Sequence, residues 1–142
     1  MTDNSHDNLP RIALKRAQNW LQSAQRGLED DRWDDCVYNA QMAAEQAIKG
    51  LFIKLGVYYK RIHDVSEFFR RLEGDKSLPT FFREKIQRFS DNMEELTSQR
   101  NLAGYGFEEG IGDEYFKEYA PLAFQYAQEI VADISKVLDK LN

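Results

Sequence analysis

Arg100 interrupts an apolar helical stripe, and its side chain is a candidate for binding an anion. The stripe advances by three or four residues at a time, as one face of a helix does, through Phe82, Ile86, Phe89, Met93 and Leu96. The next step of four falls on Arg100. A guanidinium is therefore predicted to point into the helix-packed interior or into a cleft beside it, where its planar fork of N–H donors suits phosphate or carboxylate.

The spacing leaves two interpretations of Arg100 open. An arginine near the C-terminus of a helix can complement the helix dipole and extend its charged end to water. Alternatively, Arg100 lines a cleft and contacts an anionic ligand, a nucleic acid or a carboxylate on a partner. We predict the second, because a buried guanidinium must find acceptors.

Other kinds of chemistry find little support in the sequence. It has no Cys/His cluster at metal-ligand spacing, no glycine-rich phosphate loop after a strand and no serine nucleophile motif. The acidic pairs Asp34-Asp35 and Glu94-Glu95 are typical of solvated helix positions. The single cysteine, Cys36, lies within a helical pattern and is assigned no role. We therefore expect neither a metal site nor a cofactor.

Composition predicts one soluble domain. The chain has 142 residues, 42% of them hydrophobic, which suits a single core. No run approaches the roughly 20 apolar residues of a membrane span, and the N-terminus has no apolar signal core, so we expect a cytoplasmic protein without a membrane partner.

The net charge of -5 argues against bulk nucleic-acid affinity. Residues 49 to 100 are nevertheless locally basic, which fits either a phosphate-attracting face or an ordinary solvated surface.

Hydrophobic periodicity predicts an all-α fold, an up-and-down four-helix bundle with an additional short helix. Residues 1–10 are expected to form a flexible tail and residues 11–142 a single domain. The four long helices are expected at about 14–28, 33–55, 79–100 and 113–141, with Pro79 in the first turn of the third and an adjustment at Pro121 in the fourth. A short helix is expected between Asp64 and Gly74. Asp64 and Glu67 are placed to cap that short helix.

Small residues line one side of the second predicted helix, at Ala40, Ala43, Ala44, Ala47 and Gly50. Such a side lets another helix approach closely. This suits either the centre of a bundle or the contact between two copies, and we predict a homodimer partly on this ground.

From about residue 11 to residue 141 the chain resembles the HEPN domain family. The resemblance rests on Trp20-Leu21, on the segment Asn39–Leu51, on His63-Asp64-Val65 and on Arg100-Asn101. Many members are metal-independent ribonucleases that dimerise and carry an Arg-x4-6-His motif at the end of the third long helix. The resemblance implies that Arg100 stabilises phosphate charge in a cleft shared by two copies.

The chain departs from that motif at the position of the histidine. A common variant reads Arg-Asn-x-x-x-His-x-Tyr, and here Tyr105 stands in the place of the histidine and Phe107 in the place of the final tyrosine. Tyrosine, with a reference pKa near ~10, is a poorer proton carrier at neutral pH than histidine, near ~6.5. His63 is a conceivable substitute, although capping and packing fit its position better. The expected site therefore comprises Arg100, Asn101 and Tyr105.

These observations favour a noncatalytic HEPN-like module that binds RNA, a nucleotide or a partner through a dimeric cleft. The family resemblance suggests a toxin-antitoxin pair in which a nucleotidyltransferase is the partner. In such pairs the enzyme can attach AMP to the terminal tyrosine of the motif, which Phe107 cannot accept and Tyr105 could. One alternative is a metal-independent endoribonuclease toxin using Arg100 with Tyr105 as an atypical proton donor. The other is a purely structural dimerisation domain.

Overall fold

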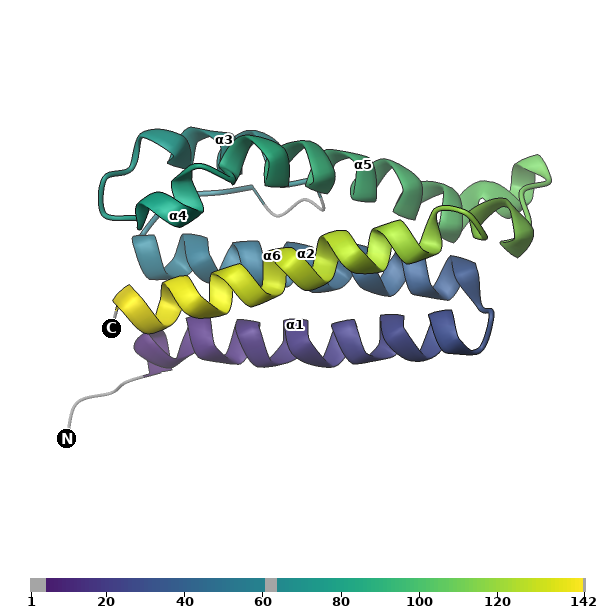
Figure 1. Ribbon diagram of the computed structural model, residues 1–142, viewed down its shortest axis with the longest axis horizontal. Coiled ribbons are helices and arrows are strands. Elements are labelled where there is room, and N and C mark those ends of the chain that lie inside the picture. The colour runs from purple at the N-terminus through teal and green to yellow at the C-terminus, as the bar shows by residue number, and fades with distance from the viewer. Residues whose placement is uncertain (1–4, 61–63, 142) are drawn as a thin grey trace.

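The protein is a bundle of four long antiparallel helices, seen in a computed structural model that describes residues 5–60 and 64–141. The long helices are α1 (Ser5–Glu29), α2 (Trp33–Leu55), α5 (Ile86–Tyr105) and α6 (Ala120–Leu141), and successive ones run in opposite directions (Figure 1). Short elements connect them: α3 (Ser66–Arg70), η1 (Arg71–Gly74), α4 (Thr80–Arg83), η2 (Gly106–Glu109) and η3 (Asp113–Phe116). The part of the chain that the structure describes contains no strand, which confirms the all-α prediction.

Helix α2 is the central element of the bundle, because it packs against α1, α5 and α6. Its small residues are all buried, at Ala40, Ala43, Ala44, Ala47 and Gly50. A Cβ atom built on Gly50 would lie 3.0 Å from the Cβ of Ala13 and 3.3 Å from the carbonyl oxygen of Pro10, so α1 sits directly on this part of α2. The small side of α2 is therefore used inside the chain, and it does not offer the exposed surface for a second copy that we inferred from it.

Replacing Gly50 with valine is expected to lower the free energy of unfolding by about 1–3 kcal/mol, because the added methyl groups would overpack the contact between α1 and α2. Chemical denaturation of both proteins measures the difference. Gly74→Ala is the matched control, since a Cβ there meets no atom within 4 Å, and its effect should stay within about 0.5 kcal/mol. Equal stability of Gly50→Val and the unmodified protein would contradict this packing.

The two ends of the chain differ in part from the sequence prediction. Helix α1 begins at Ser5, so residues 5–10, expected to be tail, are helical and Pro10 lies inside the helix. A proline at this position removes one backbone hydrogen bond and crowds the carbonyl four residues earlier, a cost that the rest of α1 must offset. At the other end, α6 begins at Ala120 rather than near Asp113, and residues 113–116 form only the single turn η3. Pro121 lies in the first turn of α6, where a backbone N–H has no helical acceptor.

The apolar stripe that ends at Arg100 spans two helices rather than one. A turn at Glu84 and Lys85 separates α4 from α5, yet Phe82, Ile86, Phe89, Met93 and Leu96 are all fully buried as the spacing predicts. Helix α5 also continues past Arg100 to Tyr105. Arg100 consequently lies within a helix, one turn before its end.

The sequence predicted the end of α2 and the start of α3, and the structure agrees fully with the first prediction and in part with the second. Gly56 follows α2 in the left-handed conformation, at φ 68°, as predicted. Before α3, a carboxylate oxygen of Asp64 accepts the backbone N–H of Ser66 at 3.0 Å. Glu67 does not complete the expected capping pair and instead binds Arg71 at 3.0 Å.

Among the described helices, none is both long and apolar enough to cross a membrane.

Candidate functional site around Arg100

The Arg100 side chain is buried between α5 and α2, with 6% of its surface exposed. Its Nη2 donates a hydrogen bond to the hydroxyl of Tyr38 at 3.0 Å. The guanidinium carbon also lies 4.7 Å from the centre of the Tyr38 ring, within the range of a cation–π contact. The continuation of the apolar stripe thus predicted correctly that Arg100 points inward rather than out to water.

Arg100 has no acidic partner within residues 5–60 and 64–141, and its buried Nε has no hydrogen-bond acceptor there. Some arginines of the bundle are neutralised by carboxylates: Arg88 binds Glu129 at 2.6 Å, and Arg70 binds Asp91 at 2.7 Å. Arg83, like Arg100, has a buried Nε without an acceptor among the described residues. A buried cation with a single neutral acceptor is costly, because the water that would solvate the guanidinium has been removed. Arg100 therefore has unused capacity to bind an anion.

Tyr38, on α2, is the contact of Arg100 that the sequence did not reveal. The ring lies across α5 at Arg100 and at Gly104, where an added Cβ would lie 3.6 Å from a ring carbon. The two contacting residues are 62 positions apart. Helical periodicity within one segment cannot detect such a pair, because the contact depends on how α2 and α5 pair in the bundle.

Asn101 and Tyr105 do not gather around the guanidinium in the single chain. Asn101 is exposed, and Tyr105, at the last residue of α5, is 68% exposed. Phe107 follows in η2 with 70% exposure. Most of the Tyr105 side chain is therefore accessible at the surface. The candidate substitute His63 lies outside the described residues.

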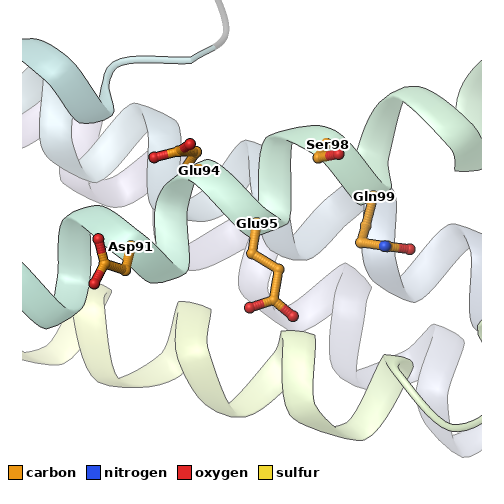
Figure 2. A pocket seen from close by; sticks show the side chains of 5 residues that line it. All are labelled: Asp91, Glu94, Glu95, Ser98 and Gln99. Atoms are coloured by element: carbon orange, nitrogen blue, oxygen red, sulfur yellow. The ribbon is translucent and has the colours of Figure 1, made fainter.

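A surface depression on α5 is acidic, and Arg100 does not line it. Figure 2 shows its lining side chains, from Asp91, Glu94, Glu95, Ser98 and Gln99. Arg70 neutralises Asp91 and Glu94, at 2.7 and 2.9 Å. Glu95 of this depression also acts on Tyr119. Burial and, to a smaller extent, the charge of Glu95 raise the pKa of the Tyr119 phenol far above its usual range, so the phenol stays neutral. Its carboxylates make this depression unsuitable for an anion. Arg100 is the candidate anion site because its buried guanidinium has no carboxylate partner among the described residues.

The thiol of Cys36 cannot act as a nucleophile in the folded protein. Cys36 is fully buried and its Sγ lies 3.6 Å from the carbonyl oxygen of Ala120. Burial raises the pKa of this thiol to about 12. The reactive thiolate is therefore absent at neutral pH, in agreement with the absence of an assigned role.

Comparison with known proteins connects this architecture with one family. The model of the HEPN domain family matches residues 11–140. A protein of Methanocaldococcus jannaschii described as a "putative toxin" is 26% identical over 136 residues, which cover 93% of this chain and 85% of that protein. No solved structure matches the chain.

Proposed function

Because the chain belongs to the HEPN domain family, we propose that it is a noncatalytic HEPN module that binds the phosphate of RNA or of a nucleotide in a cleft shared by two copies. The observation that carries this proposal is Arg100, a buried guanidinium with no carboxylate partner among the described residues and an unused Nε–H. A phosphate oxygen is the strong acceptor that such a group lacks.

The absence of catalysis follows from Tyr105. A ribonuclease of this type needs a group that exchanges a proton with the RNA 2′-hydroxyl near neutral pH, and histidine is suited to that exchange while tyrosine is not. Exposure of Tyr105 leaves its phenol in water, without a basic partner among the described residues. Arg100 could then hold phosphate without promoting its transfer.

The proposal is tested by titrating the protein with 5′-AMP and with a short single-stranded oligouridine in the presence of EDTA. We expect saturable binding that weakens as salt is raised, because phosphate contacts release counterions, together with intact RNA after incubation. Absence of binding to both probes would contradict the anion site. Efficient cleavage would favour the second candidate, an endoribonuclease toxin, which the description of the M. jannaschii relative supports.

A nucleotidyltransferase partner is a further candidate, favoured by the exposed side chain of Tyr105. A toxin-antitoxin pair would place such an enzyme against the end of α5, where Tyr105 could accept AMP and Phe107 could not. Mass spectrometry after coexpression with a neighbouring nucleotidyltransferase gene would detect the added AMP. A Tyr105→Phe variant should then remain unmodified.

A homodimer is expected in solution, because the proposed cleft is shared by two copies. Light scattering should give about twice the chain mass of 16.6 kDa at micromolar concentration. A monomer under these conditions would contradict a cleft shared by two copies. The small residues of α2 are buried within the chain and give no support for a dimer, so this expectation rests on the family alone.

A further inference from the structure

We propose that Tyr38 is an internal cap on Arg100, and that an anion binds by replacing the Tyr38 hydroxyl on the Nε–Nη2 edge of the guanidinium. This inference rests on the proposed function, since it concerns how the same arginine receives its ligand. It assigns Tyr38 a part in binding and defines the chemistry of the ligand as an anion with two oxygens on one atom.

The two donors concerned lie on the same edge of the guanidinium. Nε–H and one N–H of Nη2 point in parallel, and this edge forms two-point contacts with carboxylate and phosphate. In the structure Nη2 donates to the hydroxyl of Tyr38 at 3.0 Å, and the buried Nε has no acceptor among the described residues. The edge thus holds one neutral oxygen where it could hold two charged ones.

Exchange of the hydroxyl for an anion improves both contacts. The bond to the Tyr38 hydroxyl already has a charged donor, and an anion would supply a charged acceptor as well. In a two-point contact Nε would also gain a partner that it lacks. The exchange has a cost, because the Tyr38 hydroxyl must leave a position where it satisfies Arg100. The affinity measured for the whole protein is the intrinsic affinity multiplied by the fraction of time that the Tyr38 hydroxyl is displaced from Arg100.

The ring of Tyr38 can remain while its hydroxyl is removed, which separates the cap from the packing. Tyr38→Phe keeps the aromatic ring 4.7 Å from the guanidinium carbon and removes the oxygen that Nη2 contacts. The guanidinium would then be left with no acceptor on this edge. Tyr38 is a positioning residue in this scheme, since it acts through Arg100.

The test is a titration of the full-length protein with inorganic phosphate and, separately, with acetate, followed through the backbone amide chemical shifts of α5. Tyr38→Phe should bind phosphate at least threefold more tightly than the unmodified protein. Tyr115→Phe is the matched control, since it removes a hydroxyl from an exposed tyrosine in η3 and should leave the affinity unchanged. Circular dichroism of each variant establishes that the fold is retained.

The outcomes separate the two proposals. Equal or weaker phosphate binding by Tyr38→Phe, with binding that still requires Arg100, would overturn the cap and leave the proposed function standing. Failure of both the unmodified protein and Tyr38→Phe to bind either anion would overturn the cap. The proposed function is overturned only if 5′-AMP and oligouridine also fail to bind. If phosphate binds more tightly than acetate and this binding requires Arg100, the ligand is a nucleotide or RNA. If acetate binds more tightly, the cap is supported but the ligand is a carboxylate on a protein partner.

Discussion

Replacement of Arg100 with alanine is expected to weaken binding of 5′-AMP and of single-stranded RNA by at least about tenfold, or about 1.4 kcal/mol. The substitution removes the buried guanidinium, for which the described residues supply only the Tyr38 hydroxyl as an acceptor. The free energy of unfolding should fall less than the binding free energy. The hydrogen bond to the Tyr38 hydroxyl is lost, but the cost of burying a cation that has no carboxylate partner among the described residues is relieved. Calorimetric titration and thermal denaturation measure the two effects on the same samples.

Arg100→Lys distinguishes charge from geometry. It keeps the positive charge but loses the planar fork, so binding should still be weaker than in the unmodified protein. Arg88→Ala is a matched control, because Arg88 lies on the same helix and is neutralised by Glu129 at 2.6 Å. If Arg100→Ala strongly lowers stability and leaves binding unchanged, Arg100 is a structural residue and the site should be abandoned.

A histidine at position 105 is expected to raise ribonuclease activity far above that of the unmodified protein, for which we propose little or none. A well-placed general acid or base contributes about 10²- to 10⁴-fold to a rate, so Tyr105→His should cleave single-stranded RNA in EDTA at least about a hundredfold faster. The position tolerates the change because Tyr105 is exposed at the end of α5. Gel analysis of a labelled oligonucleotide measures the rate.

The double variant Arg100→Ala/Tyr105→His provides the control for this gain. It should be inactive, because the histidine would then lack the arginine that stabilises phosphate charge. Cleavage by the unmodified protein at the rate of the histidine variant would show that the noncatalytic assignment is wrong. A histidine variant that binds RNA without cleaving it would show that Tyr105 does not occupy the proton-transfer position.

The sequence predicted the helices better than their ends. The stripe from Phe82 to Leu96 identified buried residues correctly, although it could not reveal the turn at Glu84 and Lys85. Two successive helices can keep the same spacing of apolar residues, so periodicity does not mark the break. The late start of α6 at Ala120 escaped for a related reason, since residues 113–116 form a single turn that has too few residues to show a period.

The candidate site was predictable only where it follows from one helix. Arg100 was found because its own helix places it after Leu96 on the buried face, and it is buried as expected. Tyr38 was missed because its contact with Arg100 joins α2 to α5 through the bundle. The small residues of α2 permitted two interpretations, and the structure shows that they are buried within the chain, with Gly50 against Ala13 of α1.

The most direct test of the central claim is the NMR signal of the Arg100 Nε–H, identified by its loss in Arg100→Ala and followed during titration with 5′-AMP. This N–H is buried and has no acceptor within the described part of the chain, so a bound phosphate should move its resonance strongly and slow its exchange with water. The account predicts a saturable shift of this signal, with the same affinity as that measured by calorimetry. An Nε–H resonance that stays unchanged at saturating ligand would contradict it.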